Sequence, residues 1–316
     1  MQNLTEFAGN ATSNRSLSVI IKVCVVIPFF CVFLCCIVVM LHIFASNRQF
    51  LDSSRYILFA YMLINDTVQL LFSVLLFLSV MGNVKFAFVY CIPLLLLSTT
   101  TFKNTPLILA TMSLERYVAI FYPLQRPTAW RSDRIWIIIL SLWLISCIFS
   151  VIQLSIGGMD LALDILSTPV YCTSTIITKS SPIQAMFHTA VNIFLFTVVS
   201  IAILFTYVRI LLDTRKMRQD EVSGSKAMHT VLLHGFQLVL CMLAFTHPIT
   251  ESLLGLHSRL LLGDISFFNY FCFILTPRFL SPLIYGFRDQ SIRACLGKTF
   301  LCCSNKVKPG VRGKQR

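Results

Sequence analysis

The sequence predicts an all-α membrane protein, built as a seven-transmembrane helix bundle. Of its 316 residues, 56% are hydrophobic and only 12% are charged, whereas a soluble domain carries about 25% charged residues. Apolar runs that reach the roughly 17–25 residues needed to cross a bilayer occur along the whole chain. They are residues 19–44, 56–81, 91–114, 135–156, 185–212, 229–255 and 265–286. The chain is therefore expected to lie in a membrane.

The positions of the basic residues predict which way the bundle faces. If the N-terminus lies outside, 19 of the 26 Lys and Arg fall in the inside loops and tail, and 5 fall outside. The remaining two, Lys103 and Arg278, lie within spans. Because cytoplasmic loops carry the excess of Lys and Arg, this count predicts an extracellular N-terminus and a cytoplasmic C-terminus. The net charge of +13 therefore belongs to the membrane surface and does not indicate a nucleic-acid partner.

Three segments follow from this topology. Residues 1–18 are expected to form a glycosylated extracellular tail, because Asn3, Asn10 and Asn14 each begin an Asn-X-Ser/Thr sequon. Residues 19–286 form the bundle, and residues 287–316 form a cytoplasmic segment that ends in a basic tail.

Two of the twelve Cys differ from the others in position. Cys91 lies at the outer end of the third span and Cys172 lies in the long outer loop, on the side where disulfides persist. A bridge would pin the loop over the mouth of the bundle; the alternative is two unrelated thiols. The sequence has no Cys/His metal spacing and no Ser/His/Asp constellation, so we expect no cofactor, no metal and no enzyme activity.

An acid and a base, Glu115 and Arg116, stand together at the inner end of the third span. Charges at that depth are costly, so the pair needs a partner or a mechanism. The simplest alternative is an Arg side chain that extends to the lipid headgroups. Arg116 follows Cys91 by 25 positions, which is enough helix to cross the hydrocarbon.

The sequence around this pair resembles that of a known family. Met112-Ser-Leu-Glu-Arg-Tyr-Val-Ala-Ile-Phe-Tyr-Pro-Leu124 and Lys226-Ala-Met-His-Thr-Val-Leu-Leu-His234 resemble the third-span and sixth-span signatures of odorant receptors. These receptors are a branch of the rhodopsin-like G-protein-coupled receptors. Ser281-Pro-Leu-Ile-Tyr285 resembles the family's Asn-Pro-x-x-Tyr, with Ser281 in place of Asn. The phrase over 230–238 is most similar to the fish-type odorant receptors.

The resemblance implies a signalling mechanism. Ligand binding in the outer half of the bundle would move the inner end of the sixth span, which Pro248 can bend, and Arg116 would leave Glu115 for a heterotrimeric G protein. A short amphipathic eighth helix is implied over 287–300. Beside it, Cys295, Cys302 and Cys303 are either palmitoylation sites or ordinary thiols. The residues assigned to the switch are Glu115, Arg116, Tyr117, Tyr207, His234, Pro282 and Tyr285.

A second set of polar residues is expected in the middle of the bundle. The family keeps an Asp near Asp66 that binds a sodium ion, and Arg278 lies one turn before Pro282, facing the same region by the family fold. We expect Arg278 to pair with Asp66 and to take the place of that ion, because lone charges in hydrocarbon are expensive. The alternatives are that Arg278 extends to the interface or that Asp66 is protonated. Ser281 belongs to the same polar core.

The ligand site is expected around Lys103, which lies 13 residues before Arg116 and about halfway across the membrane. Glu251 stands at a similar depth in the sixth span. Either a polar or anionic ligand engages Lys103, or Lys103 and Glu251 form an ion pair that holds two helices. Helical phase places Ser98, Thr99 and Phe102 on one face with Lys103. The other candidates are His188, Asn192, Thr246, Ile249, Thr250 and Phe271.

The implied function is that of an odorant receptor. It would lie in the plasma membrane of olfactory cilia and bind a small-molecule odorant. It would then activate a stimulatory heterotrimeric G protein and so raise cyclic AMP. Membrane lipid is the remaining partner. The alternatives are another chemosensory or peptide receptor of the family, or a transporter or channel, although the sequence shows no internal repeats of the kind that indicate transporters.

Overall fold

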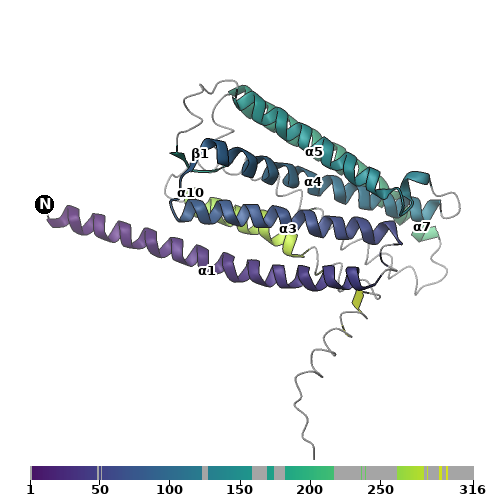
Figure 1. The fold of residues 1–316 in the computed structure, drawn as a ribbon, viewed down its shortest axis with the longest axis horizontal. Helices are drawn as coiled ribbons and strands as arrows, with labels where there is room; N and C mark the ends of the chain where they lie inside the picture. The colour runs from purple at the N-terminus through teal and green to yellow at the C-terminus, as the bar shows by residue number, and fades with distance from the viewer. Residues whose placement is uncertain are drawn as a thin grey trace, which may run out of the picture.

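The fold is an antiparallel helix bundle (Figure 1). The computed structural model describes residues 2–47, 50, 52–122, 127–158, 169–173, 182–216, 236, 239, 262–280, 283, 292–293 and 297. The long helices are α1 (Gln2–Ser46), α3 (Ser54–Met81), α4 (Phe88–Phe121), α5 (Ile135–Gly158) and α7 (Pro182–Lys216). The short elements are β1 (Phe86–Ala87), η1 (Thr128–Trp130), β2 (Pro169–Val170), α10 (Leu262–Asn269) and η4 (Tyr270–Leu275).

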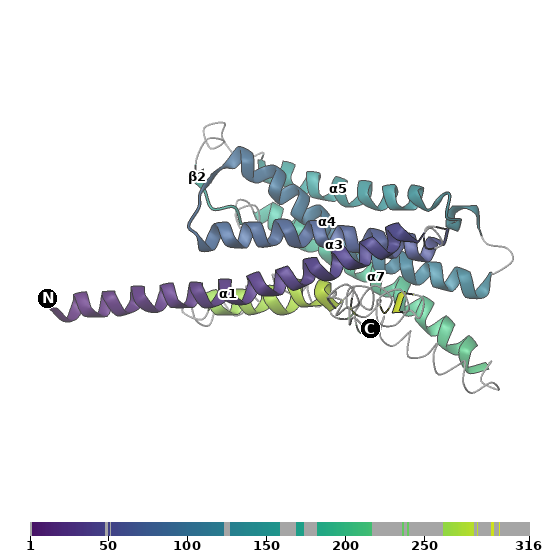
Figure 2. The ribbon, with the colours of Figure 1, turned by 60° about the horizontal axis from the view of Figure 1, so that its bottom comes forward.

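Helix α4 lies at the centre of the described bundle. It packs against α3, α5 and α7, while α1 packs against α3 (Figures 1 and 2). Most of the sixth predicted span, 229–255, lies outside the described residues, and so does most of the eighth helix expected over 287–300. Within the described residues the structure thus places helices on six of the seven predicted spans, and polar side chains of α4 are hydrogen-bonded to α3 and α5.

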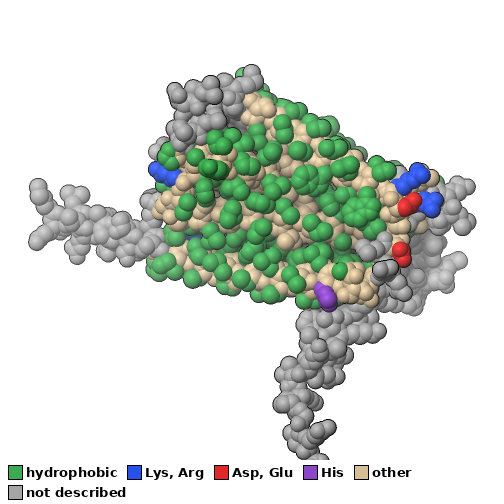
Figure 3. Space-filling view, viewed as in Figure 1, with side chains coloured by type: hydrophobic (Ala, Val, Ile, Leu, Met, Phe, Trp, Pro, Cys, Tyr) green, Lys and Arg blue, Asp and Glu red, His purple; other side chains and the backbone are tan. Residues whose placement is uncertain are grey.

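The outer surface of the helices suits a lipid environment. Among the described residues, four helical segments are long and apolar enough to cross a membrane: Leu17–Ser46, Ser54–Met81, Ile135–Ile156 and Met186–Asp213. Large apolar side chains cover the face shown in Figure 3, and charged side chains gather at its two ends. Residues such as Ile137 and Leu204 are more than 60% exposed. In water such a face would associate or aggregate, whereas in a bilayer it contacts acyl chains.

The helices are longer than the apolar runs that predicted them. α1 starts at Gln2, so the segment that carries the three sequons continues the first helix, and this end of α1 projects beyond the other helices (Figures 1 and 2). α4 continues to Phe121 and α7 to Lys216. A hydrophobic run marks only the part of a helix inside the hydrocarbon, whereas backbone hydrogen bonding continues beyond it.

The last described span contains a π-helical turn, η4, which the sequence does not predict. The Thr276 hydroxyl donates to the carbonyl of Phe271, five residues earlier, at 2.9 Å. On the same turn Tyr270 stacks on Phe77 of α3 at 5.3 Å between ring centroids. Its hydroxyl accepts a hydrogen bond from Ser73 at 3.2 Å. The wider turn therefore coincides with the contacts that fasten the last span to α3.

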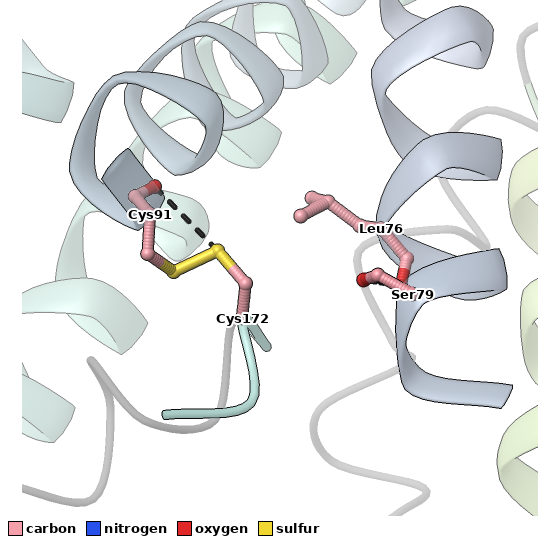
Figure 4. Close-up of a disulfide and its surroundings, with 4 residues drawn as sticks. All are labelled: Leu76, Ser79, Cys91 and Cys172. Atoms are coloured by element: carbon pink, nitrogen blue, oxygen red, sulfur yellow. Dashed lines mark hydrogen bonds between the residues drawn. A yellow bond between two sulfur atoms is a disulfide. The ribbon is translucent and has the colours of Figure 1, made fainter. Parts of the chain in front are cut away.

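The loop before α7 is tied to the start of α4. β1 and β2 pair antiparallel, with Phe86 opposite Val170 and Ala87 opposite Pro169. The predicted disulfide between Cys91 and Cys172 is confirmed: the two sulfurs are bonded, and both residues are almost fully buried (Figure 4). The strand pair and the disulfide together hold residues 169–173 across the end of the bundle, called below the disulfide end.

Candidate functional site

A network of buried polar side chains joins α3 to α4 in the middle of the bundle. Asn104 donates to the hydroxyl of Tyr61 and, at 3.0 Å, to Oδ1 of Asn65. Asn65 in turn donates to the Thr105 hydroxyl at 3.0 Å and to the carbonyl of Thr101 at 3.1 Å. Because lipid offers no hydrogen bonds, these groups must be satisfied between helices, and they fix how α3 and α4 face each other.

The network ends at the Asp66 carboxylate, next to Arg278 of the last span. The Thr105 hydroxyl donates to Oδ1 of Asp66 at 3.2 Å, and Nε of Arg278 lies 3.9 Å from the same oxygen. The two charged side chains are 1% and 4% exposed. Nη1 of Arg278 donates to the carbonyl of Ile274 at 2.8 Å, and the guanidinium lies 5.5 Å from the centre of the Phe102 ring.

This arrangement does not fit a sodium ion at Asp66. The positive charge beside the carboxylate comes from the chain itself, through Arg278. A sodium ion bound to the same oxygen would stand next to a guanidinium, and like charges that close repel strongly in a low-dielectric core. Among the described residues, no group of three or more His, Cys, Asp or Glu could hold a metal ion.

A second polar cluster surrounds Lys103, on the side of α4 that faces α5. The ammonium group donates to Oε1 of Gln153 at 2.7 Å and to the hydroxyl of Ser150 at 3.4 Å. Lys103 is only 2% exposed. His188 of α7 is close enough for its imidazole to interact electrostatically with the Lys103 charge, and Nδ2 of Asn192 lies 3.2 Å from Nε2 of His188.

Sequence reasoning missed Ser150 and Gln153, which the structure adds to this site. Both lie in an apolar run, and a lone Ser or Gln there carries no motif. The one available signal was their spacing of three residues, which places two polar groups on the same face of a helix. Thr100 lies three residues before Lys103 on α4 and Ser146 lies four residues before Ser150 on α5, and each has a buried hydroxyl oxygen without a hydrogen-bond partner among the described residues.

The other predicted ligand residues do not all meet at Lys103. Phe102 contacts Arg278 on a different side of α4, which corrects the expectation that it shares a face with Lys103, because adjacent helical residues point about 100° apart. The Thr99 hydroxyl donates to the carbonyl of Leu95, and Ser98 is half-buried on α4. Phe271 packs against Phe29 of α1 at 5.2 Å between ring centroids. The positions outside the described residues are Thr246, Ile249, Thr250 and Glu251.

The end of α4 opposite the disulfide holds the predicted switch. Glu115 is 3% exposed, and the Ser54 hydroxyl at the start of α3 donates to its Oε1 at 3.0 Å. The ring of Tyr117 lies 4.6 Å from Phe121 and 5.7 Å from Phe205 of α7. Tyr207 is half-buried on the same helix. The predicted pairing of Glu115 with Arg116 stays a prediction, and His234, Ser281, Pro282 and Tyr285 lie outside the described residues.

Comparisons with known proteins agree with this architecture. The model of the 7 transmembrane receptor (rhodopsin family) matches residues 36–285. The chain is 26% identical to Odorant receptor 131-2 of Danio rerio over 290 residues, which is 87% of this chain and 86% of the relative. It is 28% identical to Olfactory receptor 52A5 of Homo sapiens over 206 residues, or 61% of this chain and 62% of that receptor. The resemblance to odorant receptors is thereby confirmed, and the chain belongs to the rhodopsin family of seven-transmembrane receptors.

Proposed function

We propose that this protein is an odorant receptor that binds a small molecule in the half of the bundle nearer the disulfide end. The observation that carries the proposal is the similarity to Odorant receptor 131-2 over 87% of the chain. The polar cluster at Lys103 supports it, because ligand sites combine apolar walls with a few placed polar groups. The ligand site takes in the predicted positions around Lys103, on α4, α7 and the sixth and seventh spans.

The receptor lies in the plasma membrane with its N-terminus outside. The excess of Lys and Arg in the loops on the opposite side supports this orientation. The disulfide end is then extracellular, where a disulfide is stable, and Asn3, Asn10 and Asn14 are glycosylated. Expression in the cilia of olfactory neurons follows from the proposed function.

The signal leaves at the other end of α4. Ligand binding shifts the receptor towards a conformation in which Arg116 leaves its resting contacts and binds a stimulatory G protein, which raises cyclic AMP. Glu115 is held in the resting conformation by Ser54 of α3. Tyr207 and Tyr285 move towards Arg116, and Pro248 provides the bend in the sixth span.

Arg278 acts in this receptor as a built-in cation. It supplies beside Asp66 the positive charge that sodium supplies elsewhere in the family, so the resting state does not depend on sodium concentration. The 3.9 Å separation of Nε from Oδ1 and the burial of both side chains support this role.

The experiment is expression in cultured cells with an olfactory-type G protein and a cyclic AMP readout. Separate pools of amino acids, bile acids, steroids and volatile odorants are applied, with Arg116→Ala as the signalling-deficient control and surface staining for both chains. A response to one pool that requires Arg116 and the G protein is expected. A cation flux that persists without any G protein would contradict the proposal and favour a channel.

A further inference from the structure

We propose that the activating ligand carries a carboxylate group, which binds the Lys103 ammonium at a site between α4, α5 and α7. This inference rests on the proposed function and names the chemical class of its ligand. The site is defined as Lys103, Ser150, Gln153, His188 and Asn192, and is called the Lys103 site below.

The first argument is that, among the described residues, the hydrogen-bond partners of Lys103 are both neutral. Its ammonium group has three donors, and the two hydrogen bonds go to the amide oxygen of Gln153 and the hydroxyl of Ser150. Lys103 is only 2% exposed, so its charge has almost no contact with the medium outside the protein. A buried charge is expected to be paired with an opposite charge, and neutral hydrogen bonds replace only part of its hydration.

The second argument is that the buried acids of the described residues are engaged elsewhere. Asp66 is paired with Arg278, and Glu115 accepts a hydrogen bond from Ser54. Glu115 also stands twelve residues from Lys103 along α4, about 18 Å at 1.5 Å per residue. Within the described part of the chain, the Lys103 site therefore has an excess positive charge that an anion from outside the protein would neutralise.

The third argument is that the surroundings of Lys103 suit a carboxylate. Its two oxygens accept up to about four hydrogen bonds, more than one ammonium group can donate. His188 and Asn192 of α7 bring further nitrogen groups to the site, and Nδ2 of Asn192 lies 3.2 Å from the His188 ring. The buried hydroxyls of Thr100 and Ser146 have no partner among the described residues. Charge and donors thus come from three helices, which is what orients a small anion.

Binding at this site also provides a way to move the bundle. In the ligand-free arrangement Lys103 is held by Ser150 and Gln153, which links α4 to α5. A carboxylate is the stronger partner because both groups are charged, so it would take over the ammonium and draw His188 and Asn192 towards it. These contacts exist only in the bound state, as a population shift requires.

The experiment compares matched ligands on the full-length receptor in the cyclic AMP assay. The probes are hexanoate and benzoate, their uncharged counterparts hexanamide and benzamide, and the zwitterionic amino acids norleucine and phenylglycine. The chains are wild type, Lys103→Gln, Lys103→Arg and Glu251→Gln, with Lys85→Gln as the control. Lys85 is an exposed Lys near the disulfide end, 5.3 Å from the Tyr171 ring. Surface staining normalises every response.

We expect an acid to activate the wild type and its amide to be at least about 30-fold weaker, the ratio that corresponds to losing a buried charged contact of about 2 kcal/mol. Lys103→Gln should abolish this preference, Lys103→Arg should retain it and Lys85→Gln should leave it intact, whereas Glu251→Gln tests the alternative of an internal ion pair. A carboxylate could come from a simple organic acid or from an amino acid. A response to hexanoate or benzoate would indicate the first source, and a response to norleucine or phenylglycine alone would indicate the second.

Equal potency of an acid and its amide, or unchanged acid potency in Lys103→Gln, would overturn the carboxylate proposal while leaving the odorant receptor in place. Loss of the acid response in Glu251→Gln with the same loss in Lys103→Gln would assign Lys103 to an internal ion pair and would also overturn it. The failure of odorants of every class at a receptor shown to be at the cell surface would instead count against the proposed function.

Discussion

Replacing Arg278 by Gln should destabilise the receptor strongly, because the change leaves a carboxylate buried without its cation. Asp66 and Arg278 are 1% and 4% exposed, and Nε lies 3.9 Å from Oδ1. Removing one member of a buried ion pair costs about 3–5 kcal/mol. Since each 1.4 kcal/mol is a factor of ten, this loss raises the ratio of unfolded to folded receptor by about 100-fold to a few thousand-fold.

The double variant Asp66→Asn/Arg278→Gln should recover most of this loss. It removes both charges together, and the Thr105 hydroxyl, which donates to Asp66 at 3.2 Å, can donate to the Asn oxygen instead. The coupling energy of the cycle is expected to be about 2–3 kcal/mol, near the upper end of the range for contacting residues.

The assay is thermal inactivation in detergent, followed by fluorescence, together with surface expression by flow cytometry. The matched control is Arg131→Gln. Arg131 lies 3.5 Å from Asp133, but the two side chains are 65% and 60% exposed, so no measurable change is expected. If the losses of stability caused by Asp66→Asn and by Arg278→Gln simply add in the double variant, the ion pair does not stabilise the bundle and the reasoning is wrong.

Further predictions concern sodium, the disulfide, the polar network and the switch. Basal cyclic AMP of the wild type should not change when sodium is replaced by potassium, whereas the signalling of Arg278→Gln should become sodium-dependent. Cys91→Ser and Cys172→Ser should each lower surface expression, and the double change should be no worse than either, because one bond is lost in all three. Asn104→Leu should lower the unfolding free energy by about 1–3 kcal/mol, seen as a lower midpoint of thermal inactivation, because its partners on α3 are left unsatisfied. Ser54→Ala should raise ligand-free cyclic AMP, because the hydroxyl that holds Glu115 is removed; an unchanged basal level would assign Ser54 to packing alone.

The sequence predicted the parts of the structure that depend on charge and polarity within apolar runs. Asp66 and Arg278 were expected near each other because each is costly alone, and they lie 3.9 Å apart. Cys91 and Cys172 were expected to pair because both fall on the side where thiols oxidise, and they are bonded. In both cases the sequence alone shows that a residue needs a partner, and few other residues in the chain could be that partner. The role of Arg278 in place of sodium stays a prediction.

The sequence did not predict how the helices are rotated against one another. The hydrogen bonds from Lys103 to Ser150 and Gln153 of α5 were not predicted; its pairing with Glu251, which lies outside the described residues, stays a prediction. Phe102 was placed with Lys103, although one residue along a helix turns the side chain by about 100°. Rotation depends on many small packing contacts between apolar faces, and these leave no periodic signal that separates one neighbour from another. No feature of the sequence predicts the π-helical turn at Tyr270–Leu275 either.

The network between α3 and α4 also has a consequence for how the chain is made. Its members, Tyr61, Asn65, Asn104 and Thr105, all lie on two consecutive helices joined by a short connection, so they can pair as soon as α4 leaves the translocon. Asp66, by contrast, must wait until the last span, which carries Arg278, has been synthesised. During that interval the Thr105 hydroxyl is the partner that the nascent hairpin can offer it. We therefore expect truncated chains that end after α4 to insert as a stable pair of helices, while defects at Arg278 appear only late in synthesis, as receptors that are inserted but retained by quality control.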